Sequence, residues 1–409
     1  MLYYLGESFQ LLDAFGSISV RAAVAALTAF LIVMLSLPAF SRYLRALRLG
    51  DKADKSHSDR LNTLHADKSG TPAMGGLLVT VAVLFTVVLC CRFLEMGVVV
   101  LVLATALLCG LGFVDDLSKA RAPARGLSAK EGGLAARKKL LGQTAIGVIA
   151  GACLVLAAGS GFGSSLSPIG EARGAPVDGT PATAAAVDTP AASPAGAPRV
   201  MTGEDLTAVW FPFAKGFAIP LGALFCFWVA LVIVATSNAV NLTDGQDGLA
   251  AGSALTVIGA YAAIAYVAGR ADWSSYLGIP HVPGAGEVAV ACAAMGGGWL
   301  GFLWHNTHPA EVFMGDSGSL PLGGAIGLVA CLVKHELILP IIGAVFVAES
   351  VSVIIQVAWF RLTRRRIFRC APLHHHFRFG GMPEPRVVVR FWIAGALAAI
   401  AGLLSLKMG

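Results

Sequence analysis

Residues 96–119 read MGVVVLVLATALLCGLGFVDDLSK. The first nineteen of them, residues 96–114, carry no charge, and a helix of about that length crosses the ~30 Å hydrocarbon core of a bilayer. The run then ends in the adjacent carboxylates of Asp115 and Asp116, with Lys119 one helical turn after Asp115. This stretch predicts a membrane-spanning helix that carries two aspartates to one surface of the membrane.

The rest of the chain repeats this pattern. Of its 409 residues, 56% are hydrophobic and 13% are charged, whereas soluble domains carry about 25% charged residues. This composition excludes a water-soluble globule. Apolar runs predict ten spans, at residues 22–41, 74–91, 96–114, 140–161, 216–236, 249–268, 288–304, 318–333, 337–360 and 390–407. We therefore expect an all-α fold, a polytopic membrane bundle of about ten transmembrane helices in one domain over residues 1–409.

The basic residues are unevenly distributed among the loops. The loops at 42–73, 115–139 and 361–390 hold 22 of the 30 Lys and Arg residues. Because such loops stay in the cytoplasm, we expect these three loops on the cytoplasmic side and both termini outside. The net charge of +6 reflects this topology and does not indicate a nucleic-acid partner. No basic segment precedes the first apolar stretch, so no cleaved signal peptide is expected.

Residues 164–205 differ in composition from the rest of the chain. Up to residue 198 the segment is mostly Ala, Pro, Gly, Ser and Thr, which bury too little apolar surface to fold. It falls in a loop on the outer side. We expect a disordered extracytoplasmic insert with no catalytic part.

Polar motifs at the ends of the spans indicate where chemistry takes place, because ionisable groups beside a bilayer are costly. Asp115 and Asp116 repel each other unless a cation or a shared proton offsets their charge. Mg²⁺ favours one or two carboxylates together with substrate phosphates. A solvated helix end, with Asp115 paired to Lys119 at i,i+4, is the alternative.

Two further motifs follow apolar runs on the same predicted face. Residues 238–248, NAVNLTDGQDG, gather polar oxygens around two glycines that permit close backbone approach to a ligand; a helix cap is the alternative. Residues 305–324, HNTHPAEVFMGDSGSLPLGG, place Asp316 in a glycine-rich turn, and N–H groups at a helix start suit phosphate. Phe313 in this loop is suited to stacking on a flat ring or to interfacial anchoring.

The remaining polar segments are less specific. Residues 371–381, APLHHHFRFGG, contain three consecutive histidines that cannot all face one way. Contact with anionic phosphate or sugar therefore fits better than a zinc site, and a basic surface loop is the alternative. Residues 65–76, HADKSGTPAMGG, and the pair Lys138–Lys139 read as basic loop segments. Glu349 and Gln356 share one helix face and either line the interior or bond between helices.

Carboxylates, glycine turns, cationic side chains and an aromatic ring on one face predict a site for a metal–diphosphate, where transfer depends on charge neutralisation and positioning. The motifs TPAMGG, GFVDDLSK, NAVNLTDGQDGLA, FMGDSGSLPLGG, APLHHHF and VVVRFW cover most of the chain in this order. Together they resemble the phospho-N-acetylmuramoyl-pentapeptide transferase family, within the polyprenyl-phosphate sugar-1-phosphate transferase superfamily. The resemblance implies a ten-helix bundle of the inner membrane, usually a homodimer, that uses Mg²⁺ and has its active-site cleft facing the cytoplasm. It would join UDP-N-acetylmuramoyl-pentapeptide to undecaprenyl phosphate, giving UMP and the first lipid-linked peptidoglycan intermediate.

The resemblance also implies roles for individual residues. Asp115 would be the nucleophile or the base that deprotonates the lipid phosphate, since the covalent-aspartate and one-step mechanisms use the same residues. Asp116 would act beside it on metal or phosphate, and Asp316 would be the principal Mg²⁺ ligand. Uracil would contact Phe313, Gly245, Gln246 and Asp247, and the ribose–phosphate region would contact Thr71, Asn241, Asp244 and Asn306. Uridine or the phosphates would contact Lys68, Lys119 and Lys139. The phosphate and the peptide-bearing sugar would contact the further catalytic residues His374, His375 and His376.

The sequence departs from the family pattern in three places. Gln246 stands where the family usually has Leu, the loop around residues 130–137 is lengthened, and the 164–205 insert is unusual. The lengthened loop leaves open whether Lys138 or Lys139 faces the site.

Two rival functions share some of these features. A sister transferase that moves N-acetylhexosamine 1-phosphate to a polyprenyl phosphate would share the aspartates, but the HHH and VVVRFW motifs favour the muramoyl enzyme. A membrane transporter would concentrate its polar groups at the bilayer midplane, whereas here they lie in loops on one side.

Overall fold

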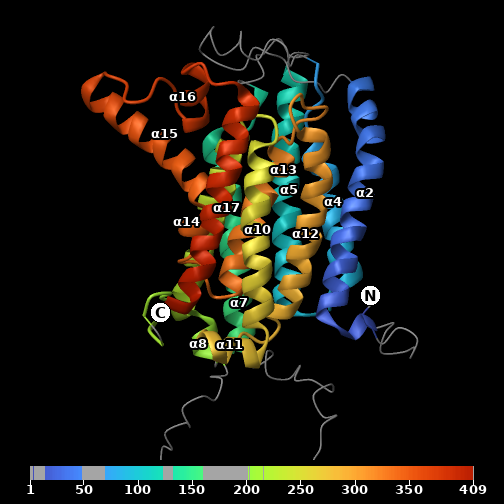
Figure 1. Cartoon of the computed structure of the whole chain (residues 1–409), viewed down its shortest axis with the longest axis vertical. Coiled ribbons are helices and arrows are strands. Elements are labelled where there is room, and N and C mark those ends of the chain that lie inside the picture. The colour runs from blue at the N-terminus through green and yellow to red at the C-terminus, as the bar shows by residue number, and fades with distance from the viewer. Residues whose placement is uncertain are drawn as a thin grey trace, which may run out of the picture.

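The computed structural model describes residues 3, 14–47, 70–122, 132–159, 201, 203–214 and 216–408. Within these ranges, eight helices are long and apolar enough to span a membrane, and α4 and α13 are shorter apolar helices. The helices are α2 (Ile18–Ala46), α4 (Gly75–Cys90), α5 (Met96–Arg121), α7 (Ala136–Gly159), α9 (Phe225–Thr243), α10 (Leu249–Ala268), α12 (Ala285–Asn306), α13 (Asp316–Leu332), α15 (Ala344–Thr363) and α17 (Glu384–Met408). Each predicted span overlaps one of them, so the all-α membrane bundle is confirmed (Figure 1).

Short elements connect these helices. They are α8 (Gly203–Leu206), β1 (Ala208–Trp210), β2 (Ala218–Pro220), η4 (Gly222–Leu224), α11 (Ala271–Leu277), α14 (Leu339–Ile342) and α16 (Leu373–Phe379). The span predicted at 216–236 begins too early, because residues 218–220 pair with β1 as an antiparallel strand and α9 begins only at Phe225. Most of the predicted insert, residues 164–200 and 202, lies outside the described residues, and α8 begins at Gly203.

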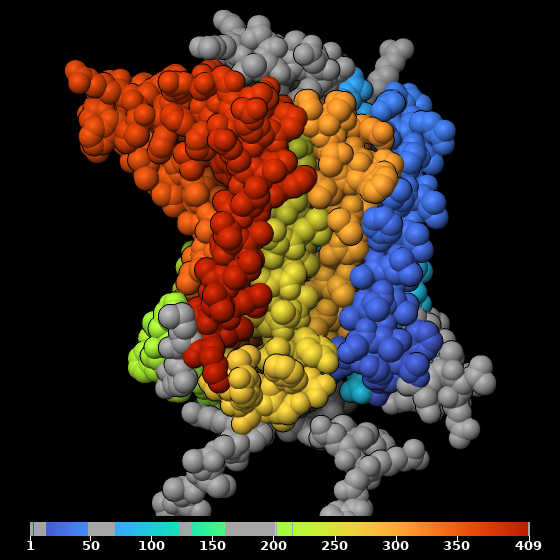
Figure 2. Space-filling view, in the orientation of Figure 1, coloured from blue at the N-terminus to red at the C-terminus, as the bar shows by residue number. Residues whose placement is uncertain are grey.

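The bundle has two chemically different ends. α17 runs from beside α16 at one end, hereafter the site end, to the C-terminus at the other, hereafter the far end (Figure 1). α2 begins at the far end, near α8 and α11. α15 diverges obliquely from the bundle, so that α15 and α16 project beyond it at the site end (Figure 2).

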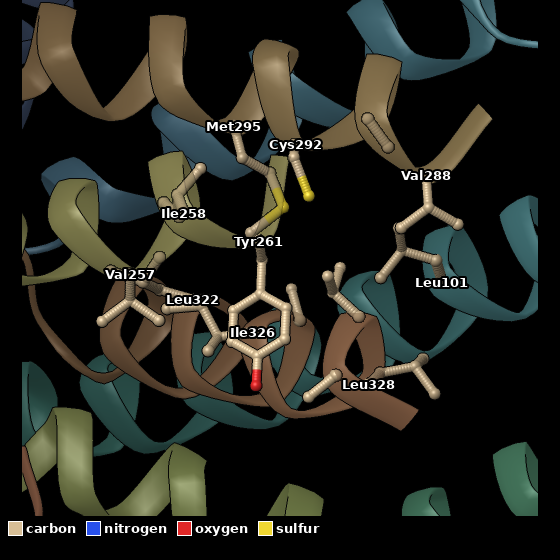
Figure 3. Packing of buried hydrophobic residues seen from close by; sticks show 14 of the residues in the cluster. Leu101, Val257, Ile258, Tyr261, Val288, Cys292, Met295, Leu322, Ile326 and Leu328 are labelled. Carbon is tan, nitrogen blue, oxygen red and sulfur yellow. The ribbon is translucent and has the colours of Figure 1, made fainter. Parts of the chain in front are cut away.

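α13 forms the centre of the bundle. Every residue from Asp316 to Cys331 is buried, as expected for a helix that is apolar on all sides. It packs against α5 and α9, and Tyr261 of α10 extends toward Leu322 and Ile326 of α13 (Figure 3). This packing fixes the first turn of α13, where Asp316 lies.

Glycines on two neighbouring helices bring that turn close to the rest of the site. A Cβ on Gly112 of α5 would lie 2.2 Å from the backbone oxygen of Asp316, and one on Gly76 of α4 would lie 2.2 Å from the Cα of Gly318. Small residues permit such close approach between membrane helices. They allow α5 to place its last turns directly beside the start of α13.

Candidate active site

Three aspartates, hereafter the carboxylate cluster, meet at the site end. Asp115 and Asp116 lie near the end of α5, Asp316 begins α13, and 200 residues separate Asp116 from Asp316. Each offers a carboxylate oxygen within 4.8 Å of the others. The residues are 2%, 8% and 8% exposed, in that order. So much buried negative charge requires cationic partners or a bound cation.

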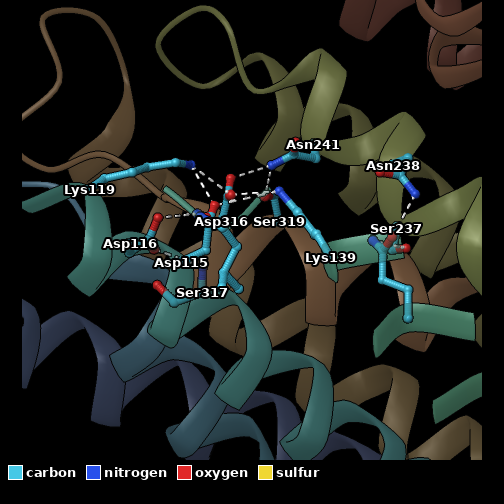
Figure 4. A network of polar contacts seen from close by, with 12 residues as sticks. Asp115, Asp116, Lys119, Lys139, Ser237, Asn238, Asn241, Asp316, Ser317 and Ser319 are labelled. Carbon is cyan, nitrogen blue, oxygen red and sulfur yellow. Dashed lines mark hydrogen bonds and ion pairs between the residues drawn. The ribbon is translucent and has the colours of Figure 1, made fainter. Parts of the chain in front are cut away.

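Two lysines supply the positive charge. Lys119 Nζ lies 2.7 Å from Asp115 Oδ2 and 2.8 Å from Asp316 Oδ2, and therefore bridges the two carboxylates (Figure 4). Lys139, at the start of α7, lies 2.6 Å from Asp316 Oδ2 and 3.8 Å from Asp115 Oδ2. Lys138 is exposed, so the structure places Lys139 in the site and resolves the choice that the sequence left open.

The opposite side of Asp316 is held by α9. Asn241 Nδ2 donates to Asp316 Oδ1 at 2.6 Å and to Ser319 Oγ at 2.8 Å. Asn238, one turn earlier, bonds to Gln143 of α7 at 3.0 Å. Asn241 thus belongs to the cluster, whereas Asn238 joins α7 to α9.

Asp116 has a structural role that the sequence did not predict. The backbone N–H groups of Asp316 and Ser317 donate to its two carboxylate oxygens at 3.0 and 2.9 Å. These groups belong to the first turn of α13 and have no partner within the helix, and a negative charge there is favoured by the helix dipole. Asp116 therefore caps α13 from a neighbouring helix and fixes the backbone that carries Asp316.

The predicted uridine residues form a second group, in the loop of residues 244–248 between α9 and α10. Gln246 is buried and donates to the backbone oxygen of His374 at 3.3 Å. Asp247 is buried and its Oδ2 lies 2.9 Å from His308 Nδ1. Asn306 accepts from Gly248 N–H at 3.0 Å and donates to the Val312 carbonyl at 2.8 Å. Asp244 ends α9.

Phe313 lies beside the TPAMGG segment. Its N–H donates to the Pro72 carbonyl and its carbonyl accepts from Gly75 N–H, both at 2.9 Å. Its side chain is half-buried, as is Thr71. The structure thus pairs the loop before α4 with the loop before α13. Lys68, also predicted for the site, lies outside the described residues.

The three histidines have different surroundings on α16, although the rings of His374 and His375 lie with their centroids 4.1 Å apart. His374 is fully buried, and its backbone N–H and ring Nδ1 both lie 3.1 Å from the carboxylate of Glu349. His376 accepts from the Arg369 N–H at 3.1 Å, and His375 is half-buried. The triplet therefore forms no single three-histidine face, and His374 joins α16 to α15.

Two residues of α17 at this end were not singled out by sequence. Glu384 accepts a bond from the 244–248 loop, and Trp392 donates to that loop. Only the VVVRFW motif, which contains Trp392, gave a signal, since a lone glutamate is common at a helix end.

The comparisons with known proteins identify a family for this chain. Residues 98–334, which carry the carboxylate cluster, match the family model described as Glycosyl transferase family 4. The chain therefore belongs to that family.

A more specific relative covers the whole chain. The protein named phospho-N-acetylmuramoyl-pentapeptide-transferase from Desulfosudis oleivorans is 39% identical over 409 residues, which is 100% of this chain and 99% of that protein. The family that the motifs resemble is thereby confirmed.

Proposed function

We propose that this protein transfers phospho-N-acetylmuramoyl-pentapeptide from its UDP-linked form to undecaprenyl phosphate, giving UMP and the first lipid-linked peptidoglycan intermediate. The observation that carries the proposal is the full-length 39% identity to a protein named for this transfer. The carboxylate cluster and its two lysines support it independently, because they combine the charges that a diphosphate transfer needs.

The reaction brings two anions together. An oxygen of the lipid phosphate attacks the phosphorus that bears the sugar, and the bond from that phosphorus to UMP breaks. Lys119 and Lys139 neutralise Asp115 and Asp316 before substrate binds. The side chain of Lys119 is 39% exposed, so its ammonium group can exchange a carboxylate for a phosphate oxygen. We assign both lysines to this charge neutralisation.

Asp115 is the residue that we assign to the incoming lipid phosphate. It would take the proton of that phosphate as a base. Alternatively it would attack the sugar-bearing phosphorus as a nucleophile and expel UMP, and the lipid phosphate oxygen would then break the bond from that phosphorus to Asp115. Its Oδ1 already accepts a 2.6 Å bond from Leu134 N–H, and its Oδ2 contacts Lys119. Both partners stabilise the ionised carboxylate that both roles require, and they oppose the burial of Asp115 and the nearby Asp316 carboxylate, which disfavour it.

Mg²⁺ is the cofactor that we propose. Three carboxylates with oxygens within 4.8 Å of one another are hard oxygen donors of the kind that Mg²⁺ prefers. Asp316, with Asp116 beside it, would hold the ion. When bound, it would neutralise charge on the diphosphate.

The remaining residues fit the substrate's two halves. Phe313, Thr71 and the 244–248 loop would receive the uridine, with Asn306 holding that loop. Lys68 belongs with this group by motif. His375 and His376 would face the phosphate and the peptide-bearing sugar, and His374 would position α16 through Glu349.

The helix ends that flank the three basic loops lie at the site end, where α2, α5 and α15 end (Figure 1). We propose that this end faces the cytoplasm of the inner membrane and that both termini lie outside. We also expect a homodimer, as the family resemblance implies. The predicted insert is shorter at its end than 164–205, because Gly203–Leu206 form the helix α8.

The test is UMP release by purified protein in lipid with Mg²⁺ and undecaprenyl phosphate, offered UDP-N-acetylmuramoyl-pentapeptide and UDP-N-acetylglucosamine separately. Release with the muramoyl substrate alone is expected. Release only with UDP-N-acetylglucosamine would move the protein to the sister activity. Release with neither, from folded protein, would refute a transferase.

A further inference from the structure

Side chains from other segments fix the shape of the 244–248 loop. Three of its backbone polar groups are bonded to side chains from elsewhere. Asp247 N–H donates to Glu384 Oε1 at 2.9 Å, Gly248 N–H donates to Asn306 Oδ1 at 3.0 Å, and the Gly248 carbonyl accepts from Trp392 Nε1 at 3.1 Å. Two of these three partners belong to α17.

Both α17 partners are firmly seated. Glu384 is 2% exposed and lies 3.4 Å from Arg378 of α16. The ring of Trp392 lies against α10, where a Cβ on Gly252 would lie 2.2 Å from its Nε1. The first turns of α17 therefore leave the loop no room to shift on that side.

The side chain of Asp247 is fixed from another direction. His308 Nδ1 lies 2.9 Å from Asp247 Oδ2, and the Ala310 N–H donates to the same oxygen at 3.2 Å. Both partners belong to the segment between α12 and α13. Backbone and side chain of the loop are thus set by different elements, before any ligand arrives.

We propose that Glu384, Trp392 and His308 are positioning residues for nucleotide recognition, which hold the 244–248 loop in the shape that receives the base of a uridine diphosphate substrate. The inference rests on the proposed function. A loop held in its bound shape binds more tightly, because less conformational freedom is lost on binding. Loss of these bonds should therefore weaken the nucleotide half of recognition and spare the lipid half.

Matched variants separate the bond from the bulk of each side chain. Glu384→Gln keeps an oxygen for the Asp247 N–H and Glu384→Ala removes it. His308→Asn keeps an N–H donor near the position of Nδ1 and His308→Ala removes it. Trp392→Phe keeps an aromatic ring and removes the donor. His308 is 39% exposed in its side chain, so its alanine variant is the one best suited to fold.

The measurements are the affinity for UMP by calorimetry and the KM for each substrate. The alanine variants are expected to lose about tenfold in UMP affinity and to raise the KM for the UDP substrate by a similar factor. The KM for undecaprenyl phosphate should stay within about twofold of the value for the unmodified protein. The variants Glu384→Gln and His308→Asn should keep most of the UMP affinity that the alanine variants lose. Trp392→Phe should give a smaller change of the same kind.

Two results would overturn the inference alone. One is unchanged UMP affinity in an active, folded His308→Ala or Glu384→Ala variant. The other is an equal rise in both KM values, which would indicate general loosening of the bundle. Absence of both turnover and UMP binding in the unmodified protein would instead refute the proposed function and this inference with it.

Discussion

Buried charge is found at both ends of the bundle, but it is arranged differently. At the far end, Arg21 of α2 and Glu287 of α12 form a bidentate pair with two 2.7 Å bonds, and they are 1% and 5% exposed. Arg21 also donates to the Cys90 carbonyl, and Glu287 accepts from Arg92 N–H. At the site end, flexible lysines with one ammonium each contact several carboxylates, and Lys119 reaches the surface.

The difference separates a structural ion pair from an exchangeable one. The guanidinium of Arg21 and the carboxylate of Glu287 match each other in geometry, so this pair is expected to stay closed. Each site lysine binds its carboxylates only as a point charge. A phosphate oxygen can therefore take the place of a carboxylate, and a metal ion can take the place of an ammonium group. Breaking the far pair should therefore affect folding, and breaking the site cluster should affect turnover.

The largest effect is expected for Asp316→Asn. It removes the charge that Lys119 and Lys139 share, while the amide keeps the size of the side chain. UMP release should fall on the order of 10³-fold, with a melting temperature close to that of the unmodified protein. Activity within tenfold of the unmodified protein would contradict the role assigned to this carboxylate.

The second-largest effect is expected for Arg21→Met, and it should be a loss of stability. It leaves Glu287 as a buried charge without its bidentate partner, at a cost of about 3–5 kcal/mol. The melting temperature in detergent should drop accordingly. The double variant Arg21→Met/Glu287→Leu should recover most of the drop, because the far pair is then replaced by apolar packing. A double variant as unstable as the single one would show that the cost lies elsewhere.

Lys139→Met compares directly with Lys138→Met, the neighbouring lysine that is exposed. The first should lower turnover about 10²-fold, since its ammonium lies 2.6 Å from Asp316. The second should change turnover by less than about twofold. Equal losses of turnover in both variants would indicate that only the overall positive charge of this segment matters.

The smallest effect is expected for Lys334→Met, beyond the end of α13. Lys334 is 3% exposed, and its Nζ has no hydrogen-bond partner among the described residues, although it lies 3.9 Å from the centre of the Phe225 ring. Burial lowers the pKa of Lys334. Replacement by an apolar chain of similar length should be neutral or should raise the melting temperature, within about 1 kcal/mol.

The sign of the pH dependence sharpens this prediction. A lysine whose pKa is lowered in the folded state binds its proton better when unfolded, so the protein gains stability as the pH rises toward the ordinary lysine value of 10.5. The melting temperature of the unmodified protein should therefore rise relative to that of Lys334→Met over this range. The charge of the nearby Glu336 carboxylate raises the pKa of Lys334 and so opposes burial, but burial is the larger effect. If the difference between the two melting temperatures did not change with pH, the result would contradict a buried ammonium group at Lys334.

The sequence predicted the spans well because apolar runs of bilayer length have few alternatives to a transmembrane helix. It offered the contact of Asp115 with Lys119 as an alternative to a cation site, since residues four apart share a helix face, and the structure contains that contact. It did not predict the Arg21–Glu287 pair, because Arg21 is one basic residue among apolar ones and its partner lies 266 residues away. The capping of α13 by Asp116 was hidden for the same reason.

The sequence by itself therefore determined the class of fold, the order of the spans and the motifs that carry carboxylates, lysines and histidines. These follow from hydropathy and from local periodicity, which neighbouring residues define. Only the tertiary structure decided that Lys139 and not Lys138 enters the cluster, that His374 is buried against Glu349, and that α17 holds the 244–248 loop. Those choices depend on how helices rotate and approach one another, which packing across hundreds of residues sets.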